Sequence, residues 1–73
     1  MIEAEVLEIV RRVAGEQSWP YLEPVLIKHR RPWLRQTGGT WEVFTNRNFI
    51  GGNIRMVIDD DTGAILSKGF MPR

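Results

Sequence analysis

The sequence has no cysteine, and it has only one histidine among its 73 residues. Without cysteine, neither a disulfide framework nor a thiolate metal site is available, so the hydrophobic core must stabilise the fold alone. His29 has no cysteine or nearby carboxylate pair with which to hold a metal, and the chain shows no nucleophile and base pattern for covalent catalysis. We therefore predict that the protein is not an enzyme and uses no metal or other cofactor.

Net charge and long apolar runs are also lacking. Ten Lys and Arg residues against nine Asp and Glu residues give a formal net charge of +1, which does not favour nucleic acid or membranes through bulk electrostatics. No apolar run approaches the roughly 20 residues needed to cross a bilayer. The first ten residues, MIEAEVLEIV, carry acids among the apolar residues, unlike a secretory signal. These absences predict a cytoplasmic protein without membrane association.

The length predicts a single domain, residues 1–73, near the lower limit at which a core suffices for folding. A homodimer would supplement such a core and is one expectation for the oligomeric state. Three tryptophans supply large apolar areas, and we expect them to be anchors of the core or of an interface.

The N-terminal segment has the apolar spacing of an amphipathic helix. Its apolar stripe consists of Ile2, Val6, Ile9, Val10 and Val13. We predict a helix from about residue 3 to about residue 14, with Gly15 as a left-handed C-terminal cap. Residues 16–24 contain two prolines and are expected to be an irregular connection, which Trp19 and Tyr21 attach to the body of the protein.

The chain is organised around residues 40–70, which have the pattern of an antiparallel β-meander. A strand over residues 25–30 precedes it and is interrupted at Pro32, which predicts an edge strand or a break into two strands. Gly38-Gly39 has the composition of a two-residue hairpin turn. That turn pairs Thr37 with Thr40, Gln36 with Trp41, Arg35 with Glu42, Leu34 with Val43 and Trp33 with Phe44.

A second hairpin is predicted at Asp60-Asp61-Thr62-Gly63, with Gly63 in the left-handed region. Pairing Asp60 with Ala64 then places Ile58 opposite Leu66 and Ile54 opposite Phe70.

Because side chains alternate along strands, these registers divide the sheet into two faces. Beneath the helix we expect Leu34, Trp41, Val43, Ile54, Met56, Ile58, Leu66 and Phe70. The other face is predicted to bind a protein partner of unknown identity or a second copy of the chain, through Trp33, Phe44, Val57 and Ile65 together with Arg35 and Arg55. The predicted fold is α+β, with an N-terminal helix packed on one face of a three- to four-stranded antiparallel β-meander.

Three elements carry a resemblance to known families: Trp41-Glu42-Val43, the Gly51-Gly52-Asn53 break, and residues 54–66 with their D-x-T-G-x-I hairpin. In this order they resemble small PepSY-like modules, and also short immunity proteins with a nuclear-transport-factor-like sheet. The resemblance covers about half the chain and implies non-enzymatic binding or inhibition. The expected function is a protein-binding or inhibitory module acting through its sheet face, and an immunity-type toxin inhibitor is the alternative.

The aspartates of the second hairpin have two other interpretations. Asp61-Thr62-Gly63 matches the aspartic-protease triplet, in which two such aspartates share a proton. Asp59, Asp60 and Asp61 could gather calcium, but the spacing and the closing glutamate of a calcium loop are missing. Turn chemistry accounts for these residues better, and we expect solvated turn carboxylates.

The one cluster of like charge consists of Lys28, His29, Arg30, Arg31 and Arg35, interleaved with Trp33. Basic groups beside an aromatic ring can hold phosphates and stack a base, so nucleic-acid binding through the segment Lys28 to Arg35 is an alternative function, with Lys28, His29, Arg30 and Arg31 as phosphate ligands. The same residues are also explained by an edge strand whose solvated charges discourage edge-to-edge aggregation, and we favour this interpretation.

Overall fold

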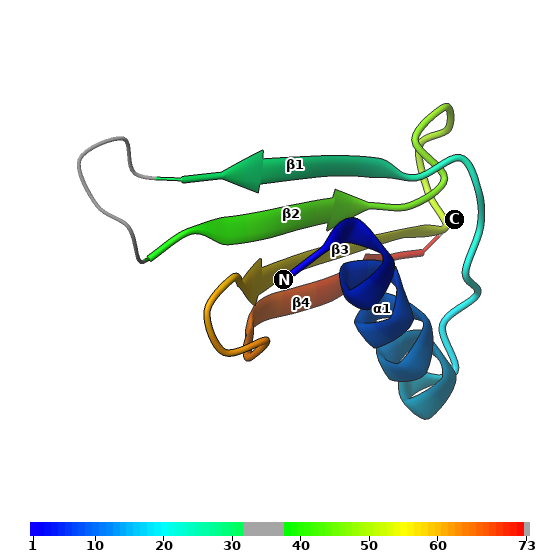
Figure 1. Cartoon of the computed structure of the whole chain (residues 1–73). Helices are drawn as coiled ribbons and strands as arrows, with labels where there is room; N and C mark the ends of the chain where they lie inside the picture. Colours follow the sequence, from blue (N-terminus) through cyan, green and yellow to red (C-terminus); the bar gives the residue numbers. More distant parts are fainter. Residues whose placement is uncertain (32–37, 73) are drawn as a thin grey trace.

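The computed structural model describes residues 1–31 and 38–72 and has one helix packed on a four-stranded antiparallel sheet (Figure 1). The elements are α1 (Glu3–Gln17), β1 (Leu26–Arg30), β2 (Thr40–Phe44), β3 (Asn53–Asp59) and β4 (Ile65–Met71). The strands lie in the sheet in their order along the chain, so the sheet is a meander with β1 and β4 at its edges. The α+β prediction is confirmed. In the described part of the chain, no helix is long and apolar enough to span a bilayer.

The helix is longer than the sequence pattern predicted. It begins after Ile2, whose backbone N–H donates to Glu5 Oε1 at 3.0 Å. Gly15 lies inside the helix, so its predicted role as the cap is wrong. The left-handed residue is instead Ser18, with φ 59°, and the N–H of Trp19 donates to the carbonyl of Ala14 at 2.8 Å. This contact satisfies a carbonyl of the last turn, which lets the helix extend to Gln17.

The first predicted hairpin is wrong, because β1 and β3 occupy both sides of β2. In the observed register Ile27 lies opposite Val43 and His29 lies opposite Trp41. This pairing places Ile27 against the core and stacks the imidazole on the indole, contacts that a tight turn at Gly38-Gly39 would have excluded. The partners predicted for β2 on the other side of that turn, Trp33, Leu34 and Arg35 among them, lie outside the described residues.

The second hairpin forms, with Gly63 at φ +75° as predicted, and Ile54 pairs with Phe70 as predicted. The predicted pairing of Asp60 with Ala64 is wrong, because Asp59 N–H donates to the Ala64 carbonyl at 2.8 Å. A β-bulge beside Val57 and Ile58 changes the register near the turn, so Ile58 lies opposite Ile65 and not opposite Leu66. Because one extra residue on a strand reverses the alternation, the predicted faces of Ile65 and Leu66 are exchanged. Ile65 packs against the core, and Leu66 is 58% exposed.

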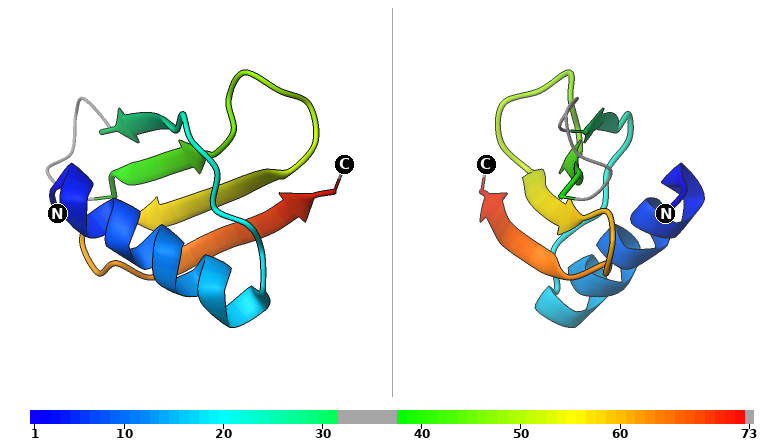
Figure 2. Two further views of the ribbon diagram at one scale, coloured as in Figure 1. Left: turned by 90° about the vertical axis from the view of Figure 1, so that its right-hand side faces the viewer. Right: turned by 60° about the vertical axis from the view of Figure 1, so that its left-hand side comes forward.

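The core lies between α1 and the face of the sheet that α1 covers (Figure 2). It consists of Val6, Val10, Val13 and Ala14 from the helix and Trp41, Val43, Ile54, Met56 and Ile58 from the sheet. Trp19 stacks on Phe70 with ring centroids 5.8 Å apart, and Tyr21 also packs against the core. The irregular connection is therefore attached to the body of the protein as predicted.

Candidate functional site

The face of the sheet opposite α1, which we call the outer face, is covered by no helix or strand of the described chain. Strand alternation and the observed registers place on it the side chains of Leu26, Lys28, Arg30, Thr40, Glu42, Phe44, Arg55, Val57, Asp59 and Ser67, together with Gly69. They form rows across the four strands, such as Leu26, Phe44, Arg55 and Gly69. Apolar and basic side chains therefore mix on one open surface.

A depression of about 580 Å³ crosses this surface, and we call it the outer groove. Leu26, Phe44 and Val57 supply its apolar lining, while Lys28 and Arg55 supply positive charge. A Cβ atom added at Gly69 would meet nothing within 4 Å, so the lining at β4 is open. The groove has the mixture of apolar anchors and polar groups that is usual for a binding surface.

The structure brings together part of the predicted partner-binding surface. Phe44, Arg55 and Val57 line the outer groove. Ile65 does not belong to it, because the bulge turns this side chain toward the core. Trp33 and Arg35 lie outside the described residues.

The predicted phosphate-binding segment is divided between the two faces of β1. Lys28 and Arg30 lie on the outer face, where Arg30 Nε is 3.5 Å from Glu42 Oε2. His29 and Arg31 turn the other way, toward Asp60, with His29 Nε2 at 3.1 Å and Arg31 Nε at 3.9 Å from Oδ2. Strand alternation therefore prevents these four side chains from forming one cluster.

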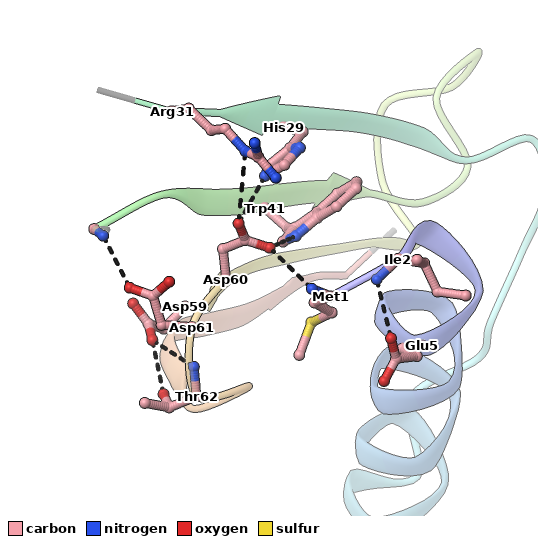
Figure 3. A network of polar contacts seen from close by, with 11 residues as sticks. Met1, Ile2, Glu5, His29, Arg31, Trp41, Asp59, Asp60, Asp61 and Thr62 are labelled. Carbon is pink, nitrogen blue, oxygen red and sulfur yellow. Dashed lines mark hydrogen bonds and ion pairs between the residues drawn. The ribbon is translucent and has the colours of Figure 1, made fainter. Parts of the chain in front are cut away.

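Asp60 is the centre of a polar network that joins the N-terminus, β1, β2 and the β3–β4 turn (Figure 3). Trp41 Nε1 donates to Oδ1 at 2.6 Å, and His29 stacks on the Trp41 ring with centroids 3.9 Å apart and planes at 3°. The amino group of Met1 lies 3.7 Å from Oδ1. The Asp60 side chain is only 10% exposed, so the expectation of a solvated turn carboxylate is wrong for this residue.

The pKa of Asp60 is lowered, first by the hydrogen bond from Trp41. The hydrogen bond and charge of His29 and the charge of the N-terminus act in the same direction, and together these effects outweigh the desolvation that raises the pKa. Sequence reasoning treated His29, Trp41 and Asp60 separately. The β1–β2 register joins His29 to Trp41, and Asp60 directly follows β3, the other neighbour of β2 in the sheet.

The two neighbouring aspartates have other partners. Asp59 Oδ2 accepts hydrogen bonds from the N–H and the hydroxyl of Thr62, both at 2.8 Å, and Asp61 Oδ2 accepts one from Gly38 N–H at 2.9 Å. The turn interpretation fits both residues. Across residues 1–31 and 38–72, no group of three His, Asp or Glu side chains is placed to hold a metal ion.

The β2–β3 loop, residues 45–52, carries a feature that sequence reasoning missed. Phe49 is 62% exposed and Ile50 is 96% exposed, although both are large apolar residues. The available signal was an apolar pair in a segment of Asn and Gly residues, which is typical of a loop and not of a buried strand.

No protein-family model, curated protein or solved structure matches this chain. The resemblance to PepSY-like modules and to immunity proteins with a nuclear-transport-factor-like sheet therefore stays a prediction. Inferences about function depend on the geometry of the outer groove, the Asp60 network and the β2–β3 loop.

Proposed function

We propose that this chain is a small protein-binding module and that the outer groove is its contact surface. The observation that supports the proposal is that Leu26, Phe44 and Val57 line an open depression on the face opposite α1. The other face of the sheet is occupied by the core. Apolar side chains gathered on an exposed face are typical of surfaces that bind other protein chains.

The charges around the groove indicate what kind of partner fits it. Glu42 is close to Arg30, which offsets its charge. Lys28 and Arg55 have no ion-pair partner among residues 1–31 and 38–72. An apolar surface with carboxylates at its edge would complement this groove, with Phe44 as the aromatic anchor and Arg55 as a hydrogen-bond donor. A second copy of the chain is the alternative occupant.

The test compares two substitutions of an apolar residue by glutamate. Phe44→Glu places a charge in the groove, and we expect weaker self-association in sedimentation and weaker partner capture in pull-downs, with an unchanged circular dichroism spectrum. Ile2→Glu, at an exposed position that precedes α1 and does not line the groove, is the matched control and should behave like the wild type. Association unchanged by Phe44→Glu would show that the groove is not the contact surface.

A second candidate function is binding of single-stranded nucleic acid on the same face. Lys28 and Phe44 both line the outer groove, and Arg30 lies farther along the same face of β1, opposite Thr40. Such a surface can hold phosphates and stack a base. If this function is correct, the chain should bind a labelled oligothymidylate, with an affinity that falls steeply as salt increases. Lys28→Ala and Arg30→Ala should weaken that binding, while Arg12→Ala on the exposed side of α1 should not. Capture of a protein partner in the absence of any oligonucleotide would instead favour the protein-binding function.

A further inference from the structure

A second depression, of about 320 Å³, lies beside α1, and we call it the α1 depression. The helix bounds it on one side, and the segment that leads from the helix into β1 bounds it on the other. Its apolar lining consists of Leu7, Tyr21, Pro24, Val25 and Ile27. Glu3 and Glu23, which are both exposed, add two carboxylates. The α1 depression therefore combines an apolar lining with negative charge.

The two depressions on this chain differ in the sign of their charge. Among the described residues that line the α1 depression, Arg11 is the one cation, and its guanidinium lies 5.3 Å from the centroid of the Tyr21 ring. Two carboxylates against that cation leave the α1 depression negative. The outer groove is instead positive, because its single acid, Glu42, is outnumbered by Lys28, Arg55 and Lys68.

The β2–β3 loop displays the opposite kind of surface, a protrusion. Its two large apolar side chains, Phe49 and Ile50, which we call the tip, are exposed. In the right-hand view of Figure 2, this loop projects from the sheet on the side opposite α1. Neither residue of the tip belongs to the core of its own chain, and Arg47 is exposed two residues before Phe49. The loop thus presents an apolar pair with a positive charge beside it.

Hydrogen bonds fix the backbone beneath the tip. The buried Asn53 side chain donates to the Phe49 carbonyl at 3.2 Å and accepts from Gly51 N–H at 2.8 Å, so it holds the chain on both sides of Ile50. The root of the loop is attached to the rest of the protein, because Arg47 N–H donates to the Pro24 carbonyl at 3.0 Å. A preorganised loop loses little conformational entropy when it binds.

We propose that this chain associates with itself, and that the tip of one copy inserts into the α1 depression of a second copy, with Arg47 facing Glu3 and Glu23. A protruding apolar pair is complementary in shape to an apolar recess. The charge of Arg47 is attracted by the α1 depression and repelled by the outer groove, which selects between the two depressions. Within one copy, no ion pair joins Arg47 to either carboxylate, so both stay available to an incoming copy.

The length of the chain favours a second copy as the occupant. With 73 residues and no cysteine, the core is small, and burial of further apolar surface between copies stabilises the folded state. The contact is heterologous, because the tip and the α1 depression are different surfaces. It leaves Leu26, Phe44 and Val57 of each copy exposed, since none of them lines the α1 depression. The proposal therefore goes beyond the outer groove and assigns a separate contact.

The first test locates the contact by photo-cross-linking. The purified chain carries p-benzoylphenylalanine at position 49 or, as the matched control, at the exposed position 66, at the opposite end of β4 from the loop. On illumination, we expect position 49 to give linked dimers whose attachment site, located by mass spectrometry, is Leu7 or lies within residues 21–27. Absence of dimers, attachment to the strands of the outer groove, or equal linking from position 66 would overturn the proposal.

The second test places the two surfaces on different chains. Ile50→Ser alters the tip and leaves the α1 depression intact, whereas Glu23→Arg reverses a charge of the depression and leaves the tip intact. Both positions are exposed, so circular dichroism should be unchanged. In sedimentation equilibrium, each variant alone should associate about tenfold more weakly than the wild type. An equimolar mixture should form a one-to-one complex, because it contains one intact tip and one intact depression.

Two results of this experiment would contradict the proposal. One is self-association that Ile50→Ser leaves unchanged. The other is a mixture that associates no more strongly than either variant alone. A wild type that stays monomeric at about 1 mM would lead to the same conclusion.

Phe44→Glu distinguishes this contact from the outer groove. It should leave the cross-link from position 49 in place, because Phe44 does not line the α1 depression. Loss of that cross-link would mean that the tip occupies the groove of the second copy, and the proposal would be wrong. If the cross-link persists and Phe44→Glu does not weaken partner capture either, the groove is refuted and the contact through the tip stands.

Other occupants of the tip are detected with the same reagents. In a cell extract, capture of a different protein by position 49 in preference to a second copy would overturn the proposal. Sedimentation of the wild type, but not of Ile50→Ser, with phosphatidylcholine vesicles containing phosphatidylserine would identify a lipid surface as the occupant and would also overturn it.

Discussion

The indole of Trp41 donates its N–H to Asp60 across 2.6 Å, which joins β2 to the turn that follows β3. The same indole is stacked by His29, whose Nε2 atom lies 3.1 Å from the other carboxylate oxygen of Asp60. An aspartate in a turn sequence thus connects three segments that are distant in the chain. Its contribution to stability depends on its ionisation, which makes it measurable.

The first prediction concerns the pH dependence of stability. The pKa of Asp60 in the folded state is below its ordinary value of 3.8, chiefly because of the hydrogen bond from Trp41. The ionised carboxylate therefore stabilises the fold above this ordinary value, and the stabilisation is lost as the pH falls through the lowered pKa. In thermal melts, Asp60→Asn should melt below the wild type at pH 7, and the difference should shrink below about pH 4. Asp61→Asn is the control, and a constant difference for Asp60→Asn at all pH values would contradict the assignment.

The second prediction concerns the core. Trp41→Ala or Ile58→Ala should each lower the free energy of unfolding by roughly 2–5 kcal/mol, because both side chains are buried between the sheet and α1. Leu66→Ala, at an exposed position, should change it by about 0.5 kcal/mol or less. Urea unfolding followed by circular dichroism measures all three. Equal losses for Leu66→Ala and Ile58→Ala would mean that the bulge is misplaced.

The third prediction concerns the base of the β2–β3 loop. Asn53→Leu removes the buried hydrogen bonds that this side chain donates to the Thr45 carbonyl and accepts from Gly51 N–H, together with its bonds to the carbonyls of Asn46 and Phe49. We expect a loss of about 1–3 kcal/mol in unfolding free energy and faster amide hydrogen exchange at Gly51. Asn48→Leu, at an exposed position of the same loop, should change neither quantity. Exchange at Gly51 that is unaffected by Asn53→Leu would mean that this network does not order the β2–β3 loop.

The fourth prediction compares two glycines. Gly63 has φ +75°, and an added Cβ would lie 2.9 Å from Cε of Met1, so Gly63→Val should be destabilising by more than about 1 kcal/mol. Gly15 lies in the helix with open space around its Cα, so Gly15→Ala should be stabilising by about 0.5–1 kcal/mol. Chemical denaturation of the two variants should therefore show changes of opposite sign. Destabilisation by Gly15→Ala would argue that the helix ends before Gln17.

Several features could be predicted from the sequence because they depend on neighbours along the chain. The helix follows from the spacing of Val6, Val10 and Val13, although its end depended on Ser18 adopting a left-handed conformation that glycine adopts more often. The left-handed conformation of Gly63 follows from local turn chemistry. The pairing of Ile54 with Phe70 needed the bulge as well, because the turn brings Asp59 and not Asp60 opposite Ala64. The inward faces of β2 and β3 follow from simple alternation.

Tertiary structure decided the features that depend on register and on contacts between distant segments. Pairing of β1 with β2 placed His29 on Trp41 and separated it from Lys28, because neighbouring residues of a strand point to opposite faces. The bulge in the β3–β4 pairing then exchanged the faces of Ile65 and Leu66, since a single extra residue reverses the alternation between the bulge and the turn. The exposure of Ile50 was likewise decided by the buried Asn53, whose hydrogen bonds to both sides of the loop form only when β2 and β3 are aligned.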